Sequence, residues 1–164
     1  MKTQRGFTIL ELMLTLAIAA VVLAIGAPGL RTFIQNTRTA TEMNDLITAI
    51  NIARSEAAAR SMSVSVVPLS ANDWSDGWQV ITDRDEDGVI DAVDVVVDVF
   101  GNGMTRSSTD FGSYITFRST GEVLTPVLDD DFVITPDECT TQNPLRVIEI
   151  KRSGLIDMHT SACP

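Results

Sequence analysis

Residues 6–30 read GFTILELMLTLAIAAVVLAIGAPGL, and the hydrophobicity of the 164-residue chain is concentrated in this stretch. From Phe7 to Leu30, 18 of the 24 residues are apolar. At about 1.5 Å per residue, a helix of this length measures about 36 Å, which is enough to cross a hydrocarbon core of about 30 Å. We therefore expect a membrane-spanning helix at residues 7–30, followed by a soluble domain at residues 31–164.

Basic residues flank the apolar stretch unevenly, and this asymmetry orients it. Lys2 and Arg5 precede the stretch, and the next basic residue is Arg31. Basic residues favour the cytoplasmic side of a membrane. We therefore expect residues 1–6 in the cytoplasm and the soluble domain on the opposite side.

A removable secretory signal, cleaved near the small residues of Ala24-Ile25-Gly26, is the alternative for the same stretch. Two features argue against it. The apolar region is longer than the usual run of about 7–15 residues, and it carries Glu11 near its start. A carboxylate in an apolar helix costs free energy, so it marks a function and needs a partner.

The residues around this carboxylate, Gly6-Phe7-Thr8-Ile9-Leu10-Glu11, resemble the cleavage motif of type IV prepilins, and residues 12–30 after them carry no charge. In that family a prepilin peptidase cuts after the glycine, here Gly6, and methylates the new N-terminus, here Phe7. The resemblance implies that the segment first anchors the chain in the inner membrane and later forms the helical core of a filament. It also implies that Glu11 docks subunits, by neutralising the α-amino group of a neighbour's Phe7 where water is scarce.

A helical pattern continues beyond Pro28. The proline removes one helix hydrogen bond, and the resemblance implies a segment that can melt in the filament; the alternative is a simple end to the membrane helix. From there to about Arg60 the spacing predicts an amphipathic helix that lies on a sheet. The expected sheet-facing residues are Leu30, Phe33, Ile34, Thr37, Met43, Leu46, Ile47, Ile50 and Ala53, and the charged residues largely between them are Arg31, Arg38, Glu42, Asp45 and Arg54.

Shorter motifs narrow the resemblance to one group. The segment Asn51-Ile52-Ala53-Arg54-Ser55-Glu56-Ala57 resembles the "ARSEA" segment of the GspH/FimT group of minor pilins and pseudopilins, and residues 77–83, 115–121 and 153–154 resemble that group as well. One long helix followed by short strands predicts an α+β fold, with the helix packed on antiparallel sheets as in pilins. The candidate strands are residues 62–67, 77–82, 93–100, 114–118, 145–151 and 155–160.

Cys139 and Cys163 are the only cysteines of the chain. An exported domain meets an oxidising compartment, which favours a disulfide between them. Closing a loop of about 25 residues stabilises a fold by roughly 3.5 kcal/mol in the chain-entropy model. We expect this bond to hold the C-terminal hairpin in place. The alternative, two free thiols, needs a reducing compartment.

An aspartate-rich segment has the spacing of an EF-hand calcium loop. Such loops place oxygen ligands at positions 1, 3, 5, 7, 9 and 12, around a glycine at position 6. The flanking residues read as strands and not as helices, so a plain acidic hairpin turn remains the alternative to a calcium site. The residues at the ligand positions are Asp83, Asp85, Asp87, Val89 through its carbonyl, Asp91 and Asp94, with Gly88 at the sixth place.

The net charge of −10 argues against nucleic acid as a partner, because phosphate binding needs clustered Lys and Arg. Without residues 1–6, the balance is 10 basic against 22 acidic residues, or −12. Some FimT-like pilins bind DNA through a Gly-Arg-x-Arg sequence after the last turn, where this chain has Leu155-Ile156-Asp157. Arg146, Lys151 and Arg152 leave a small basic patch, which is a weak candidate for DNA.

Catalysis has no support, because the lone His159 has no nucleophile and orienting residue at an interpretable spacing. Trp74 and Trp78 are either core residues or interface residues.

The function that the resemblance implies is a minor pilin of a type IV pilus, in assembly initiation or at the tip. The alternatives are a minor pseudopilin of a type II secretion system and a surface-exposed pilin that binds DNA for uptake. Other pilins or pseudopilins are the expected partners, with the soluble domain in the periplasm before assembly, and later in an extracellular pilus or a periplasmic pseudopilus.

Overall fold

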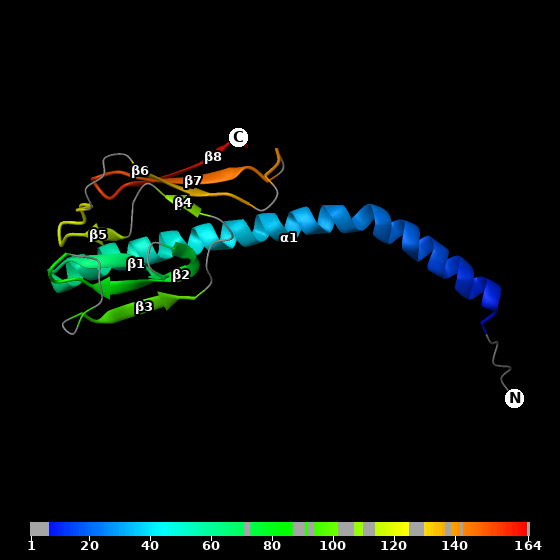
Figure 1. The fold of residues 1–164 in the computed structure, drawn as a ribbon, viewed down its shortest axis with the longest axis horizontal. Coiled ribbons are helices and arrows are strands. Elements are labelled where there is room, and N and C mark those ends of the chain that lie inside the picture. The colour runs from blue at the N-terminus through cyan, green and yellow to red at the C-terminus, as the bar shows by residue number, and fades with distance from the viewer. Residues whose placement is uncertain are drawn as a thin grey trace, which may run out of the picture. The chain divides into compact units, whose positions relative to one another are not determined.

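The computed structural model describes residues 7–163, apart from 71–72, 87–90, 92–93, 102–106, 110–113, 125–129, 137–138 and 142. The chain separates into an N-terminal unit, Met1–Ile34, and a globular unit, Gln35–Pro164, and one helix contributes to both. The elements are α1 (Ile9–Arg60), β1 (Val64–Ser70), β2 (Asp73–Thr82), β3 (Val96–Phe100), β4 (Ser107–Thr109), β5 (Ile115–Phe117), β6 (Asp130–Ile134), β7 (Leu145–Ile150) and β8 (Ile156–Ser161) (Figure 1).

From Ile9 onward, the N-terminal unit is an exposed apolar helix. An 18-residue window of α1 has a mean hydropathy of 2.5, and none of that window is buried. By length and composition this part of α1 can cross a membrane. The expected membrane-spanning segment therefore forms a helix whose apolar side chains find no cover within the described part of the chain.

In the globular unit, α1 presents one buried face to the sheets. The buried positions recur every three or four residues, which is the spacing of one helix face, and they are Thr39, Glu42, Met43, Leu46, Ala49, Ile50, Ala53 and Ala57. The helix ends at Arg60, as predicted. Ser61 follows in the left-handed region with φ of 55°, and the N–H of Met62 donates to the carbonyl of Ala57 at 3.3 Å. This pattern is a Schellman motif, which stops the helix.

Two predictions about the faces of α1 were wrong. Leu30, Phe33 and Ile34 were expected on the sheet-facing stripe but are 60%, 67% and 56% exposed, because the buried positions begin only at Thr39. Glu42 was placed among the charged residues between the apolar ones, yet it is 3% exposed. Arg38, one turn earlier, donates from Nε to Glu42 Oε1 at 3.0 Å, so the carboxylate keeps a cationic partner at the edge of the core.

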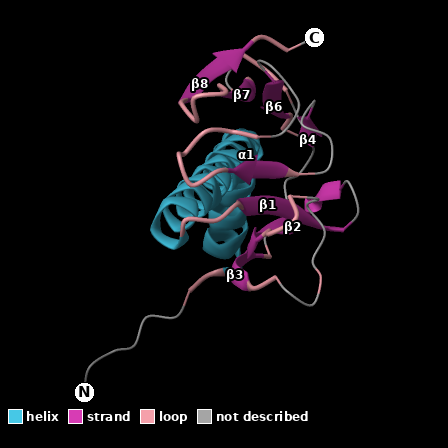
Figure 2. Cartoon of the chain, turned by 90° about the vertical axis from the view of Figure 1, so that its left-hand side faces the viewer, coloured by secondary structure: helices cyan, strands magenta, loops and turns pink. Residues whose placement is uncertain are grey.

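Two four-stranded antiparallel sheets form the rest of the globular unit. Their strand orders are β3-β2-β1-β5 and β4-β6-β7-β8. Figure 2 shows the strands of both sheets around the part of α1 that belongs to this unit. All six candidate strands have counterparts, although β3 begins at Val96 and not at residue 93. The final hairpin is in register from Leu145↔Ser161 to Ile150↔Ile156.

Three features of the sheets were not predicted. Strands β4 and β6 were missed, and Asp130 and Asp131 begin β6, where they pair with Ile150 and Glu149. Strand β2 begins at Asp73, four residues earlier than expected. Ser75 donates side-chain and backbone hydrogen bonds to Asp73, and these hold the pKa of this carboxyl below its ordinary value. Acidic residues have low strand propensity, so local sequence argues against strands at both places.

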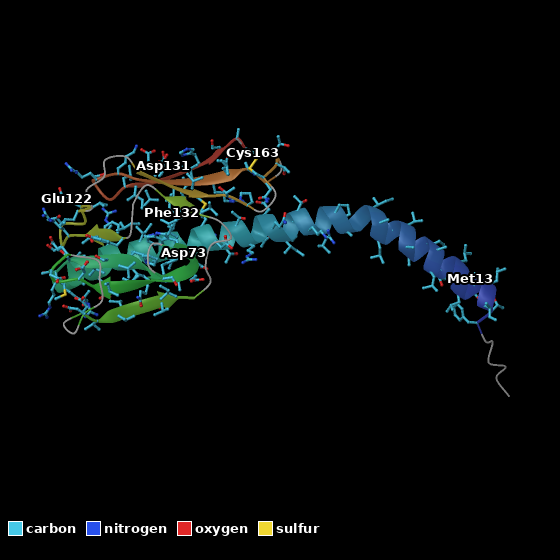
Figure 3. All side chains as sticks on the ribbon, in the orientation of Figure 1. Met13, Asp73, Glu122, Asp131, Phe132 and Cys163 are labelled. Atoms are coloured by element: carbon cyan, nitrogen blue, oxygen red, sulfur yellow. A yellow bond between two sulfur atoms is a disulfide. The ribbon has the colours of Figure 1, made fainter. Side chains whose placement is uncertain are left out.

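Aromatic residues join the two sheets in one core. Trp74 and Trp78 are 1% and 0% exposed, so both are core residues. The ring of Trp74, on β2, meets the ring of Phe132, on β6, edge to face with centroids 4.9 Å apart. Trp78 stacks on Phe100 of β3 at 6.1 Å. Figure 3 labels Phe132 on its strand. The two sheets and the helix therefore share one hydrophobic core.

Candidate functional site

The first turn of α1 is capped by Thr8. Its Oγ1 accepts a hydrogen bond from the N–H of Glu11 at 3.2 Å, and its carbonyl accepts one from Leu12 at 3.2 Å. A Thr at the N-cap with a Glu three residues later is the capping-box pattern. We did not predict this cap, although the spacing Thr8-x-x-Glu11 is its sequence signal. Glu11 is thus fixed in the first turn, where the helix dipole favours a negative charge.

Glu11 is a single carboxylate at the start of an exposed apolar surface. Both it and Phe7 are exposed, Phe7 by 75%. Within the described residues, the Glu11 carboxylate makes no hydrogen bond or ion pair, so it remains available to a cation from another molecule. Gly6 lies outside the described residues, and cleavage after it stays a prediction.

Pro28 lies inside helix α1 and does not end it. A proline has no N–H, so it donates no hydrogen bond to the carbonyl one turn earlier. The hydroxyl of Thr32 donates to the Pro28 carbonyl at 3.3 Å, which bridges the turn that follows. The alternative of a simple helix end is therefore wrong, whereas melting of this segment in a filament stays a prediction.

The predicted disulfide between Cys139 and Cys163 is present, with Cα atoms 5.8 Å apart. Figure 3 shows the sulfur–sulfur bond beside Cys163. It joins the segment that precedes β7 to the residues that follow β8. Because β7 and β8 are paired along their whole length, the bond closes the open end of the final hairpin, as expected.

The aspartate-rich loop is only partly described, since Asp87 and Val89 lie outside the described residues. Asp83 is buried, and its carboxylate accepts a hydrogen bond from the Ser65 hydroxyl at 2.5 Å. Asp94 accepts the N–H of Asp91 at 3.2 Å. The described residues bring together no group of three His, Cys, Asp or Glu side chains that could hold a metal ion. Calcium binding stays a prediction.

A calcium site would raise the melting temperature of the full chain, because an ion that binds only the folded state stabilises it. Calcium at a hundredfold excess over its dissociation constant adds about 2.7 kcal/mol. Differential scanning fluorimetry in millimolar calcium or in chelator measures the shift. Asp91→Asn should abolish the shift, whereas Asp157→Asn, on exposed β8, should keep it. Equal melting temperatures with and without calcium would contradict the hypothesis.

The three basic residues of the weak DNA candidate have different surroundings. Arg146 is half-buried, and its Nη2 donates to Asn36 Oδ1 on α1 at 2.5 Å. Lys151 forms an ion pair with Glu149 at 3.7 Å. Arg152 is exposed and, within the described residues, makes no hydrogen bond or ion pair through its guanidinium. Only one of these cations is thus fully available to a ligand.

Arg54 joins α1 to two turns, an arrangement that we did not predict. Its Nη1 donates to the carbonyl of Gly154 at 2.9 Å. The N–H of Val123 donates to the carbonyl of Arg152 at 3.0 Å. Gly121 and Gly154 have positive φ angles of 82° and 76°. We call this set of residues, Arg54, Gly121, Val123, Arg152 and Gly154, the Arg54 junction.

The Arg54 junction ties the two sheets to the helix. Gly121 follows β5 of the first sheet, and Gly154 lies in the turn between β7 and β8 of the second. A Cβ at Gly154 would collide with the carbonyl oxygen of Gly121, and one at Gly121 would lie 3.0 Å from Arg54 Nε. Three separate segments that resemble the GspH/FimT group in sequence therefore meet at one place.

Two family models match the chain. The model described as "Prokaryotic N-terminal methylation motif" matches residues 1–27. The model described as "Type II transport protein GspH" matches residues 42–154, which is more than half of the chain. The chain belongs to the GspH family. Together with the methylation motif, this membership makes it a pilin-like subunit, a minor pilin or pseudopilin.

Solved structures show the same fold as this GspH-family protein. The type IV minor pilin FimU of Pseudomonas aeruginosa matches in two crystal forms. In space group P21 the TM-score is 0.62, with 20% identity over 77% of this chain and 92% of that chain. In space group P65 the TM-score is 0.57, with 22% identity over 73% of this chain and 90% of that chain. The minor pseudopilin EpsH of the Vibrio cholerae Type 2 Secretion System matches with a TM-score of 0.49 and 10% identity, over 75% of this chain and 97% of that chain. Curated protein sequences give no significant match.

The two FimU likenesses confirm the predicted α+β fold of the GspH-family protein, with a long helix on antiparallel sheets. The family match spans the whole Arg54 junction, from the helix to the turn between β7 and β8. The junction was missed because its parts are far apart in sequence, as the 100 residues between Arg54 and Gly154 show.

Replacing Gly154 with alanine should lower the free energy of unfolding of the GspH-family protein by at least about 2 kcal/mol. The positive φ disfavours any side chain there, and the added Cβ would overlap the Gly121 carbonyl. Urea denaturation followed by circular dichroism measures the change. Gly101→Ala is the matched control, because a Cβ at Gly101 meets nothing within 4 Å. An equal effect of both substitutions would show that the junction is not tightly packed.

Proposed function

We propose that the chain is a minor pilin that enters a type IV pilus through its N-terminal helix, and that it initiates assembly or lies at the tip. The observation that carries the proposal is the apolar part of α1. The match to the methylation motif, residues 1–27, overlaps this part of the helix. An 18-residue window of the helix has a mean hydropathy of 2.5, and none of it is buried. Such a surface needs lipid or the helices of other subunits to cover it. A filament core supplies that cover.

Processing prepares the helix for docking. A prepilin peptidase would cut after Gly6 and methylate Phe7, which leaves a positive α-amino group two residues before the helix. The Glu11 carboxylate of a neighbouring subunit would neutralise this cation in the dry core of the filament. An unpaired charge there costs several kcal/mol, so the pair sets the axial register between subunits. The cap by Thr8 supports this role, because it fixes the turn that carries Glu11.

Before assembly, the chain would be a single-pass protein of the inner membrane with its globular unit in the periplasm. Lys2 and Arg5 favour the cytoplasm for the leader. The disulfide between Cys139 and Cys163 fits an oxidising compartment on the opposite side. After extraction from the membrane, the globular unit would lie on the surface of an extracellular filament.

A minor pseudopilin of a type II secretion system is the second candidate, favoured by the description of the matching family as a type II transport protein. Both filaments use the same N-terminal helix, so its properties support either function. We put the pilus first, and the fold likeness to a type IV minor pilin, at a TM-score of 0.62, supports this order.

Shearing of pili from cells tests the choice. The full chain, with a C-terminal epitope, is produced in source cells that lack the untagged protein, and sheared pili and membranes are compared by immunoblot. We expect the chain in the sheared pili and fewer pili on cells that lack it. The proposal would be contradicted if the chain were absent from the pili, and if its loss stopped secretion of type II substrates but left the number of pili unchanged. These results would indicate a pseudopilin.

A further inference from the structure

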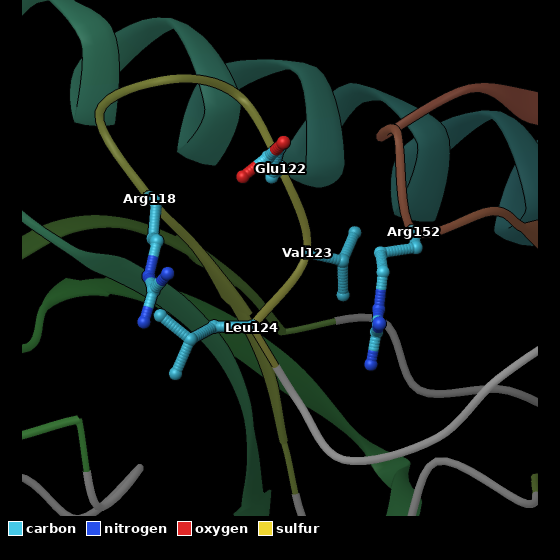
Figure 4. A pocket seen from close by; sticks show the side chains of 5 residues that line it. All are labelled: Arg118, Glu122, Val123, Leu124 and Arg152. Atoms are coloured by element: carbon cyan, nitrogen blue, oxygen red, sulfur yellow. The ribbon is translucent and has the colours of Figure 1, made fainter.

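A pocket of about 450 Å³ lies beside the Arg54 junction. It is lined by Arg118, Glu122, Val123, Leu124 and Arg152. Figure 4 shows Arg118 and Arg152 on either side of Val123 and Leu124, with both guanidinium groups pointing the same way. The pocket thus has two cationic walls and a small apolar floor, which is formed mainly by the half-buried Leu124 because Val123 is 7% exposed and belongs to the core.

Both guanidinium groups are available to a ligand. Within the described residues, neither Arg118 nor Arg152 makes a hydrogen bond or ion pair through its side chain. Glu122 is the acidic residue of the pocket, but in Figure 4 its carboxylate lies apart from the two guanidinium groups. Glu122 Oε2 instead accepts a hydrogen bond from the Thr120 hydroxyl at 3.4 Å. No internal carboxylate therefore neutralises the two cations in the described part of the chain.

The backbone holds the two arginines in a fixed relation. The N–H of Arg118 donates to the carbonyl of Glu122 at 2.9 Å, and the N–H of Val123 donates to the carbonyl of Arg152 at 3.0 Å. Arg54 also ties the turn between β7 and β8 to helix α1, through the carbonyl of Gly154. The backbones of the two arginines therefore keep a fixed spacing, so that one ligand can meet both side chains without a rearrangement of the turns.

We propose that this pocket binds a carboxylate side chain from an acidic segment of another protein, with an apolar neighbour of that carboxylate on Leu124. A guanidinium binds a carboxylate with two parallel hydrogen bonds, and such charge-assisted bonds are about twice as strong as neutral ones. The site goes beyond the proposed function, and it does not depend on which filament the chain enters.

The acidic balance of the chain after residue 30 favours a short peptide over nucleic acid. The chain after residue 30 carries 21 acidic against 10 basic residues, or −11. A nucleic acid would carry a row of phosphates past this acidic surface, and repulsion acts over about 8 Å at physiological salt. A peptide segment brings one or two charges into the pocket and apolar side chains onto its floor. Only the peptide matches both parts of the lining.

Fluorescence anisotropy with the full chain in nonionic detergent tests the proposal. The probe is a short fluorescein-labelled peptide with one aspartate and one glutamate between leucines, and the control peptide carries asparagine and glutamine instead. We expect the acidic peptide to bind at least about tenfold more tightly than the amide peptide. Arg118→Gln and Arg152→Gln should each weaken binding of the acidic peptide about 5- to 30-fold.

Matched variants separate the pocket from general charge and from folding. Arg84→Gln removes the same charge from an exposed site outside the pocket, and it should change the affinity less than about twofold. Arg118→Lys should restore part of the affinity, because it keeps the charge but loses the paired hydrogen bonds. Unchanged circular dichroism spectra show that the variants fold. The proposal would be overturned if both peptides bound equally or if all three Arg→Gln variants had equal effects. It would also be overturned if a DNA duplex displaced the peptide and its binding needed both arginines.

Discussion

Replacing Trp74 with alanine should lower the free energy of unfolding of the globular unit by about 3–5 kcal/mol. Trp74 is 1% exposed, and its ring meets Phe132 edge to face at 4.9 Å. The substitution leaves a cavity where the two sheets meet, and it removes an aromatic pair that adds about 0.5–1.5 kcal/mol beyond area burial. The indole Nε1 makes no hydrogen bond within the described residues, so the loss is one of packing.

Urea denaturation of the full chain in detergent, followed by far-ultraviolet circular dichroism, measures this loss. Trp74→Phe keeps part of the ring and should cost less than the alanine variant. Leu155→Ala is the control, because Leu155 is 58% exposed, and it should change the free energy of unfolding by less than about 0.5 kcal/mol. A loss below about 1 kcal/mol for Trp74→Ala would show that the two sheets do not share one core.

Replacing Glu11 with glutamine should reduce incorporation of the chain into filaments about a hundredfold or more. Glutamine keeps the size of the side chain but leaves the α-amino group of a neighbouring subunit without an anionic partner. Removing one partner of a buried ion pair costs about 3–5 kcal/mol, which corresponds to this factor. The ratio of chain in sheared filaments to chain in membranes, measured by quantitative immunoblot, gives the effect.

Three variants isolate the docking role of Glu11. Glu56→Gln breaks an exposed ion pair with Arg60, which is worth about 0.3–0.5 kcal/mol, and should leave incorporation nearly unchanged. Thr8→Ala removes the helix cap at a cost of about 1 kcal/mol and should have a smaller effect than Glu11→Gln. Glu11→Asp keeps the charge and should restore part of the incorporation. Equal incorporation of the wild type and Glu11→Gln would show that the carboxylate does not dock subunits.

The features that could be predicted from the sequence depend on local patterns. The apolar run and the three-to-four-residue spacing predicted α1 and its end near Arg60, because helix formation and capping depend on neighbours within one turn. The presence of only two cysteines in the chain predicted the disulfide. Alternating residues predicted the strands of the final hairpin, whereas β6 was missed because its first residues, Asp130 and Asp131, gain their strand conformation from pairing with β7.

The features that were missed depend on contacts between distant residues. Arg54 was assigned to the charged side of the helix, and its bond to Gly154 spans 100 residues. Glu42 was assigned to the same side, although Arg38 allows it to lie buried. The pocket between Arg118 and Arg152 exists because two turns of different sheets meet there. Such pairings follow from the arrangement of the strands, which local spacing does not determine.

The mature N-terminus shows whether the chain is a processed filament subunit. Intact mass spectrometry and N-terminal sequencing of the protein extracted from the membranes of its source cells identify this terminus. Cleavage after Gly6 removes 6 of 164 residues, so we expect a chain of 158 residues that begins with methylated Phe7. A chain that begins at Ala27 would contradict the account, because it would show that residues 1–26 are a removable secretory signal.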